Sequence, residues 1–350
     1  MPRFTPILFF LLLLVARAFG VGEWGLVKYE GRDYVTLANV GQFYQLGTLQ
    51  QSGNNLTLRT TARSLRGQLG SPEFYINNLK FILSYPIADI GGQPSISRID
   101  LTKLLEPVLR PSRIQNSAKV DTIVLDPGHG GHGNGATSLF GCEKNYALDV
   151  ALRARELLRL AGYKVLMTRT TDRFVPLEER AAFASRYPNG LFISIHFNSG
   201  GNDATGVETF TLAPRGVPSM AADGPSLSDF VPCNGNTRDA ENIALACATH
   251  ATLVSNSAMF DRGIKRARFV VLKDSATPGV LIEGGFLSNS GDARRIATAT
   301  YRQQMATSIY QAVQNYHNAV GPRQSLPVAS AASDTRPNIP TVVTTPTATQ

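Results

Sequence analysis

Four side chains in the second half of the sequence are of the types that hold a catalytic zinc ion and act on its water. His129 lies in a glycine-rich loop after one apolar run, His196 ends a second apolar run, and Glu143 opens a helical stretch between them. Two imidazoles and one carboxylate leave a fourth zinc position for water. We therefore predict that His129, Glu143 and His196 bind one zinc ion.

Glu283 is the candidate catalytic residue, because it is a lone acid in the run Val-Leu-Ile-Glu-Gly-Gly-Phe. An ionised carboxylate is costly to bury among apolar side chains unless it is paired or lies near a cation. Beside zinc, it can take a proton from the water and pass it to the leaving amine. The alternative is a strand-end acid held by a local hydrogen bond.

Other residues near these motifs are weaker candidates. His132 is a rival ligand in the same loop, but we expect it to be exposed. Cys142 precedes the glutamate that opens the helix, and we expect it to be a small packed thiol. His250 and His317 lie in helical stretches and are expected to pack or to face solvent. The glycine-rich loop could cradle a phosphate, but it lacks the Gly-Lys-Ser/Thr ending and the dinucleotide spacing.

Strands and helices alternate from Val120 onward, which predicts an α/β domain with a mostly parallel sheet flanked by helices. Because such sheets bind ligands at the carboxyl ends of their strands, the four candidate residues should converge. Helices are expected from 143 to about 161, at 176–186 and 239–257, and as a closing helix from 296 to 316. Strands are expected at 121–125, 164–169, up to 196, and at 207–212, 269–272 and 279–283.

The rest of the chain divides into three further segments. Residues 1–20 have the basic start, apolar core and small-residue ending of a secretory signal peptide, which competes with a membrane anchor. Residues 22–113 contain short strand-like runs without histidine or cysteine and predict a small α+β or β-rich accessory domain. The catalytic domain is expected at 118–320, and a disordered tail, poor in apolar residues, at 321–350.

The net charge and the number of cysteines limit the possible functions further. A formal net charge of +8 suits an exported protein that binds anionic envelope polymers. Nucleic acid is not expected as a partner, because no run of lysine and arginine is interleaved with aromatics. Three cysteines are too few for a disulfide framework, although export would permit one bridge, for which we favour Cys233 and Cys247.

Four motifs carry a family resemblance: Leu-Asp-Pro-Gly-His-Gly-Gly, Gly-Cys-Glu-Lys-Asn, Phe-Ile-Ser-Ile-His-Phe-Asn, and Arg-Gly-Ile-Lys leading to Val-Leu-Lys and Pro-Gly-Val-Leu-Ile-Glu-Gly-Gly-Phe-Leu-Ser-Asn. In this order, over about 120–318, they resemble the zinc-dependent N-acetylmuramoyl-L-alanine amidases that hydrolyse bacterial cell wall. The resemblance implies zinc ligands at His129, Glu143 and His196, catalysis by Glu283, and cleavage between N-acetylmuramic acid and L-alanine of the stem peptide.

The resemblance also bears on partners and on the other segments. Peptidoglycan is the implied substrate, a protein activator is a candidate partner, and the periplasm or cell envelope is the expected location. Some division amidases carry an inhibitory helix before Arg-Gly-Ile-Lys, but here only Thr249–Asp261 lies there, so we do not expect that form of inhibition. We expect Pro214–Asn236 to be a surface loop near the substrate groove.

Two alternatives to the amidase stay open, and the accessory domain has a resemblance of its own. The alternatives are a zinc peptidase that cuts another amide of the wall and an inactive wall-binding protein. In the accessory domain, Gly-Arg-Asp-Tyr-Val-Thr-Leu and Phe-Tyr-Ile-Asn-Asn-Leu-Lys-Phe-Ile-Leu are similar to the amino-terminal domain of the copper amine oxidases. Without histidine, it is not expected to bind copper.

Overall fold

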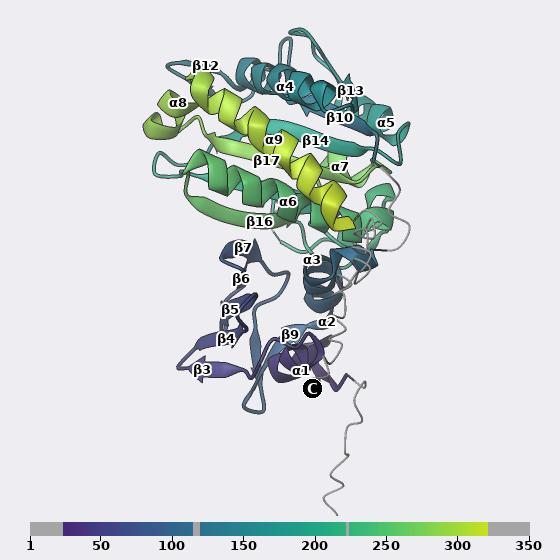
Figure 1. Cartoon of the computed structure of the whole chain (residues 1–350), viewed down its shortest axis with the longest axis vertical. Helices are drawn as coiled ribbons and strands as arrows, with labels where there is room; N and C mark the ends of the chain where they lie inside the picture. The colour runs from purple at the N-terminus through teal and green to yellow at the C-terminus, as the bar shows by residue number, and fades with distance from the viewer. Residues whose placement is uncertain (1–23, 115–119, 222–223, 321–350) are drawn as a thin grey trace, which may run out of the picture.

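The computed structural model describes residues 24–114, 120–221 and 224–320. The predicted signal peptide and the predicted tail therefore lie outside the described residues. Figure 1 shows a larger carboxy-terminal part, with helices packed on a sheet, and a smaller amino-terminal part below it. Among the described residues, no helix combines the length and apolarity that crossing a bilayer requires.

The carboxy-terminal part contains six strands in the order β13-β10-β14-β17-β15-β16. In this part of the described chain, only β15 runs antiparallel to a neighbour, β17, and the other pairs are parallel. The strand expected at the first apolar run begins one residue late and reaches Pro127. The strands are β10 (Thr122–Pro127), β13 (Lys164–Met167), β14 (Leu191–Asn198), β15 (Val207–Leu212), β16 (Asp261–Ala267) and β17 (Gly279–Phe286), with a small hairpin of β11 (Thr137–Ser138) and β12 (Gly141–Cys142).

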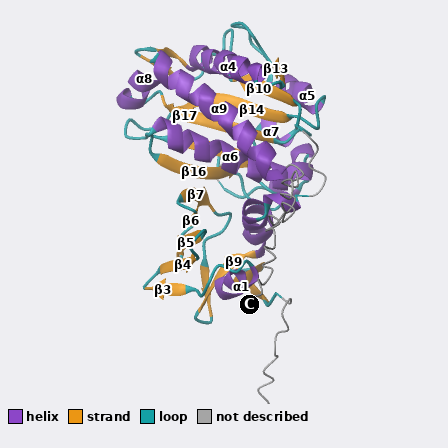
Figure 2. Cartoon of the chain, in the orientation of Figure 1, coloured by secondary structure: helices purple, strands orange, loops and turns teal. Residues whose placement is uncertain are grey.

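Helices cover both faces of this sheet (Figure 2). Buried side chains of α4, α6 and α9 pack with Ile123, Ile193 and Ile282 on one face, and those of α5 and α7 pack with Val124 and Phe192 on the other. Burial of these two apolar layers is the main force that holds the helices on the sheet. The helices are α4 (Glu143–Leu160), α5 (Leu177–Ser185), α6 (Asp239–Ser257), α7 (Val270–Lys273), α8 (Ser290–Ile296) and α9 (Ala299–Val320).

The amino-terminal part, which we call the module, has two groups of antiparallel strands. One is a four-stranded sheet of β1 (Leu26–Tyr29), β2 (Arg32–Thr36), β8 (Ala88–Ile90) and β9 (Gln93–Ser97). The other is a meander of β3 (Gln50–Ser52), β4 (Asn55–Arg59), β5 (Ser64–Gln68), β6 (Glu73–Ile76) and β7 (Leu79–Ile82). The module's helical segments are α1 (Leu37–Phe43), α2 (Arg98–Asp100), a π-helical turn (Leu101–Leu105), α3 (Glu106–Leu109) and a 3₁₀ turn (Pro111–Arg113).

The meander continues the carboxy-terminal sheet, which the sequence did not indicate. Strand β7 lies parallel to β16 with Phe81 paired to Ile264, so that a single mixed sheet of eleven strands crosses the described part of the chain. Arg266, which is 1% exposed, binds Asp100 at 3.2 Å and Ser84 at 2.6 Å in the module. A buried charge paired across the junction is expensive to expose, so these contacts hold the two parts together.

Two of the expected elements are wrong. The apolar run Phe269–Leu272 was expected to be a strand, but Val270–Lys273 forms helix α7, and its Val271 and Leu272 pack against the sheet. Four apolar residues are too few for periodicity to separate strand from helix. The segment Pro214–Asn236 does not lie near the candidate site. It follows β15, whose antiparallel direction against β17 carries the segment to the opposite end of the sheet.

The expected disulfide is also wrong, since all three cysteines are free. Cys233 packs with the apolar layer beneath α5 and α7, whereas Cys247 lies on α6 and packs with the layer on the other face. The sheet therefore separates the two sulfur atoms, and a disulfide needs the two Cβ atoms within about 4.5 Å. Burial raises the pKa of Cys247 to about 12, which leaves it an unreactive thiol.

Candidate metal centre

The carboxyl ends of β10, β14 and β17 meet at one edge of the sheet. In the parallel ladders, Pro127 pairs with Ile195, and His196 pairs with Glu283. This register places the loop after β10 beside the end of β14 and sets the last glutamate on the next strand. The prediction that these strand ends converge is confirmed.

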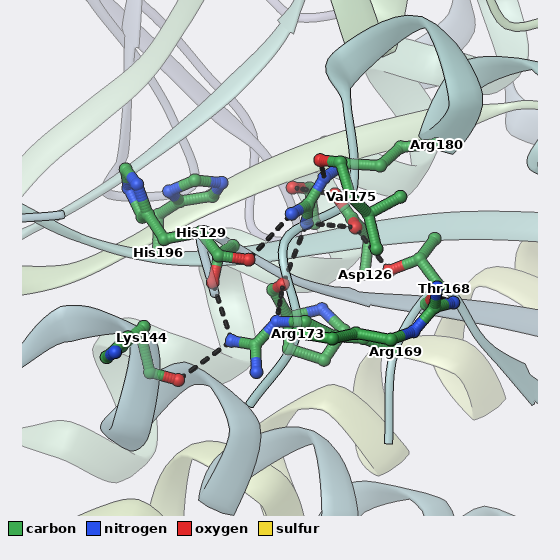
Figure 3. Close-up of polar contacts among 12 residues, drawn as sticks. Asp126, His129, Lys144, Thr168, Arg169, Arg173, Val175, Arg180 and His196 are labelled. Carbon is green, nitrogen blue, oxygen red and sulfur yellow. Dashed lines mark hydrogen bonds and ion pairs between the residues drawn. The ribbon is translucent and has the colours of Figure 1, made fainter. Parts of the chain in front are cut away.

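His129 lies in a tight loop whose backbone is held by two buried arginines (Figure 3). Its φ of +58° is in the left-handed region, which costs free energy for any residue other than glycine. Arg169 donates to the carbonyls of Pro127 at 2.9 Å and Gly128 at 2.7 Å, and Arg180 donates to the carbonyl of His129 at 2.6 Å. These charge-assisted hydrogen bonds hold the loop in its strained conformation.

Asp126 anchors this arrangement one layer deeper. It is fully buried and accepts hydrogen bonds from Arg180 at 2.8 Å, Thr168 at 2.6 Å and Ser194 at 2.8 Å. Figure 3 shows Arg180 and Thr168 around this carboxylate, to the right of the two histidines. The cluster was not found from the sequence, although Asp126 stands in the first motif, because its partners come from three distant segments.

Glu143, the first residue of helix α4, joins the two histidines. It is 3% exposed, and its Oε1 lies 3.1 Å from His129 Nε2 and 2.8 Å from His196 Nδ1. The same carboxylate accepts the backbone N–H of Phe197 at 3.1 Å and that of Ala136 at 2.8 Å. Burial favours the neutral acid, but hydrogen bonds from the two histidines outweigh it and hold the pKa of Glu143 well below its usual range.

The ligand atoms of His129, Glu143 and His196 lie within 4.8 Å of one another, which is the spacing of a shared metal ion. Among the described residues, this is the one such group of three or more. Its two nitrogens and one carboxylate oxygen match the donor set of catalytic zinc sites. The three side chains could therefore hold one metal ion.

Two glycines make room for this group. A side chain at Gly128 would clash with the His196 ring, and one at Gly135 would clash with Glu143 and His129. Gly135 also has a φ of +67°, which disfavours other residues. These two glycines therefore permit the close approach of the ligand side chains.

Glu283 stands at the same edge, next to His196 in the ladder, and its carboxyl is under-partnered. Its Oε2 atom is buried and has no hydrogen-bond partner among the described residues. Burial raises the pKa of Glu283 well above its usual value, the nearby carboxylates of Glu143 and Glu208 raise it further, and Lys265 opposes them. Such unsatisfied, perturbed carboxyls are characteristic of functional sites.

A cationic group beside Glu283 was missed as a site feature, although Arg-Gly-Ile-Lys was noted as a motif. Glu208 pairs with Glu283 across β15 and β17 and is 2% exposed. Its Oε2 binds Arg262 at 2.9 Å and Lys265 at 2.5 Å. Both basic residues of the motif therefore neutralise one buried acid next to the candidate base. The signal in the sequence was the lone acid in the strand-like run Val207–Leu212.

The weaker candidates lie outside the metal group. His132 is exposed and stacks on Phe174 with ring centroids 4.2 Å apart, as expected. His250 is fully buried and binds Asp261 at 2.8 Å and Thr209 at 3.0 Å, so it has a packing role. Cys142 precedes helix α4 and does not join the ligands. Helix α6 reaches β16 through a short turn at 258–260, and no inhibitory helix is present in this described stretch.

Comparisons with known proteins identify the family of this chain. The family model described as N-acetylmuramoyl-L-alanine amidase matches residues 123–315, which is more than half of the chain. This chain therefore belongs to that family.

Individual relatives and solved structures are similar to parts of the chain. AmiA of Escherichia coli, named an N-acetylmuramoyl-L-alanine amidase, is 30% identical over 250 residues, 65% of this chain and 86% of the relative. The uncharacterised protein YqiI of Bacillus subtilis is 34% identical over 197 residues, 56% of this chain and 85% of the relative. A crystal structure of the Clostridium difficile amidase has 30% identity and a TM-score of 0.47, covering 57% of this chain and 98% of that one.

Proposed function

We propose that this protein is a zinc-dependent N-acetylmuramoyl-L-alanine amidase that hydrolyses peptidoglycan. One observation carries the proposal: His129, Glu143 and His196 form a single metal-ligand group, and the under-partnered Glu283 lies beside it. Relatives in the same family are named amidases of this specificity. The bond cut is the amide between the lactyl group of N-acetylmuramic acid and L-alanine, in wall remodelling or daughter-cell separation.

The residues divide the chemistry between binding and proton transfer. When bound, zinc supplies a Lewis acid for the amide carbonyl and lowers the pKa of a water molecule. His129, Glu143 and His196 would hold the ion, and Arg169 and Arg180 keep the His129 loop in place.

Glu283 is the general base and then the general acid. It accepts a proton from the attacking water, whose oxygen bonds to the lactyl carbonyl carbon, and returns the proton to the alanine nitrogen as the C–N bond breaks. Burial raises the pKa of Glu283, so it holds the transferred proton more firmly than an exposed carboxyl does, which suits the return of that proton to the leaving nitrogen.

The cellular setting extends the proposal. Export to the periplasm or cell envelope follows from the signal-like residues 1–20 and from the location of peptidoglycan outside the cytoplasm. We propose the boundaries 22–113 for the accessory domain and 118–320 for the catalytic domain, with a fold similar to the copper amine oxidase amino-terminal domain for the former. A protein activator is a further candidate partner.

Muropeptide analysis tests the bond and the reaction class together. Purified sacculi are digested with the protein, and the products are analysed by mass spectrometry. The amidase leaves a free lactyl carboxyl on the glycan and a free amino terminus on L-alanine. A new amino terminus on another stem residue would instead show a zinc peptidase. If no product forms, the remaining alternative is an inactive wall-binding protein. The Glu283→Gln variant is the matched control for contaminating hydrolases.

A further inference from the structure

The module has a row of polar side chains on the outward face of its meander. In the printed register, Gln50 pairs with Thr57, Thr57 with Arg66, Arg66 with Tyr75, and Tyr75 with Lys80. Paired residues of neighbouring strands point to the same face, so these five side chains, which we call the polar row, lie side by side across β3 to β7. The alternate positions on these strands form the module's buried core.

The polar row lies on the same face of the sheet as the candidate active site. Ile264 of β16 pairs with Phe81 of β7, and both belong to the apolar layer beneath α4, α6 and α9. The residue before each, Gly263 and Lys80, therefore points to the other face. Glu208 lies on that face too. Its carboxylate binds Lys265, the residue that follows Ile264.

Direct contacts close the seam between the two parts. A side chain at Gly263 would lie 3.1 Å from Lys80 Cγ, so the glycine of Arg-Gly-Ile-Lys makes room for the lysine stem. The backbone N–H of Lys80 donates to Asp261 at 3.2 Å. Arg262 and Lys265, which are partly exposed, continue the polar surface from this seam to Glu208. Because Glu208 pairs with Glu283, the polar row leads to the candidate base.

The polar row is preorganised and hollowed. Arg66 lies over the Tyr75 ring at 5.2 Å and donates to Asn78 at 2.8 Å, so two contacts hold its guanidinium in place. Hollows of about 350 Å³ and 760 Å³ lie along the strands here, both lined by Thr57 and Arg66. Amide, hydroxyl, guanidinium and aromatic groups together match a ligand that carries hydroxyls, amides and scattered carboxylates.

We propose that the polar row is an extended subsite that binds the peptidoglycan strand being cut. This inference rests on the proposed function. It adds that the module binds a part of the same substrate, away from the bond that is cut. Seven strand spacings of about 4.8 Å separate Gln50 from Glu283, so one polymer lies across both along a track on the order of 30 Å. Glycan hydroxyls and acetamido groups pair with Gln50 and Thr57, and stem carboxylates with Arg66.

A nucleic acid or another polyanion fits the polar row itself less well, although Arg59 and Arg63 also line the larger hollow. Of the two cations in the polar row, Lys80 is already paired with Glu73 at 2.5 Å. A polyanion needs a series of free cations along its backbone, and its affinity depends on how many phosphates they neutralise. A neutral glycan with occasional carboxylates needs only donors, acceptors and one free guanidinium, which is what the polar row offers.

Charge reversal at Arg66 tests the inference. The full chain carrying Arg66→Glu is compared with wild type and with Arg159→Glu, a matched reversal on the exposed end of α4, far from the polar row. Two readouts are taken: cosedimentation with purified sacculi in the presence of a chelator, and hydrolysis of sacculi against hydrolysis of a soluble disaccharide-peptide. Thr57→Glu repeats the test at a neighbouring position.

We expect Arg66→Glu and Thr57→Glu to weaken sacculus binding and sacculus hydrolysis about tenfold, with hydrolysis of the soluble fragment unchanged. The fragment is too short to reach the polar row. Wild-type behaviour of both variants, or an equal loss in Arg159→Glu, would overturn the inference. Failure of the wild type to cut either substrate would instead sink the proposed function, and the cosedimentation would still decide whether the polar row binds the wall.

Discussion

Two groups of buried charges lie on successive layers of β10 and β14, and they are satisfied in different ways. In the lower group, both carboxylate oxygens of Asp126 accept hydrogen bonds, and Arg180 spreads its donors over this acid and the loop carbonyls. In the upper group, Glu143 gathers two imidazoles on one oxygen while Glu283 keeps an oxygen without a partner.

The difference separates a structural from a chemical use of buried charge. A buried ion pair in which every hydrogen bond is made fixes the geometry around it. The pair stays together because removal of either partner would leave an uncompensated buried charge. A buried carboxyl that lacks a partner costs stability, and proteins retain such groups where chemistry needs them. The lower group therefore positions the loop, and the upper group is the one that we propose binds the ion and moves protons.

The largest expected effect is on catalysis, and it comes from the upper group. Glu283→Gln removes the base while keeping the shape of the side chain, so we expect hydrolysis to fall about 10³-fold. Zinc content, measured by inductively coupled plasma mass spectrometry, should stay at one ion per chain because the variant leaves all three ligands. Full activity in this variant would end the assignment of Glu283 as the base.

Metal binding should distinguish the histidines of one loop. We expect His129→Ala and His196→Ala to lower zinc affinity by at least about 100-fold, since a three-ligand site loses one of its donors. His132→Ala, three residues from His129, should keep the wild-type zinc content and activity. Zinc titration with a chromogenic chelator measures both. Loss of zinc in His132→Ala would show that His132, and not His129 alone, is a ligand from this loop.

The lower group should dominate stability. Arg180→Met leaves Asp126 buried without its cation, and we expect the free energy of unfolding to fall by about 3–5 kcal/mol. Urea denaturation followed by circular dichroism measures the change. Arg186→Met, at the exposed end of the same helix, is the matched control and should change stability by less than about 0.5 kcal/mol. Equal effects in the two variants would show that the lower pair is dispensable.

The smallest expected effect is a pH dependence of opposite sign for the two upper carboxyls in chelator-treated protein. The pKa of Glu283 is raised in the folded state, so its contribution to stability falls as pH rises from its usual value of 4.5 through the raised value. The pKa of Glu143 is lowered, so its contribution is present above 4.5 and is lost as pH falls further.

Glu283→Gln separates these two contributions. We expect its free energy of unfolding to exceed that of the wild type at neutral pH and to match it below pH 4.5, while the acid-side loss from Glu143 remains in both. Urea titrations across this range measure the difference. A wild type that gains stability from pH 4.5 to neutrality relative to the variant would contradict the raised pKa.

Sequence reasoning succeeded where a residue's role depends on its own segment. Helix α6 has the expected limits, Asp239–Ser257, because its boundaries depend on local periodicity. The run Phe269–Leu272 failed because it is too short for periodicity to decide. The cysteine pair failed because which face of the sheet a residue lies on depends on the order of strands, which no local pattern encodes.

The sequence by itself determined the chemistry: which side chains are candidate ligands, which acid is the candidate base, and that they follow strands whose ends meet. Only the tertiary structure decided what surrounds them. The Asp126 cluster, the Glu208 pairing and the junction of β7 with β16 each join segments far apart in the chain. Their energies depend on burial and on paired charges, which exist only once the sheet has assembled.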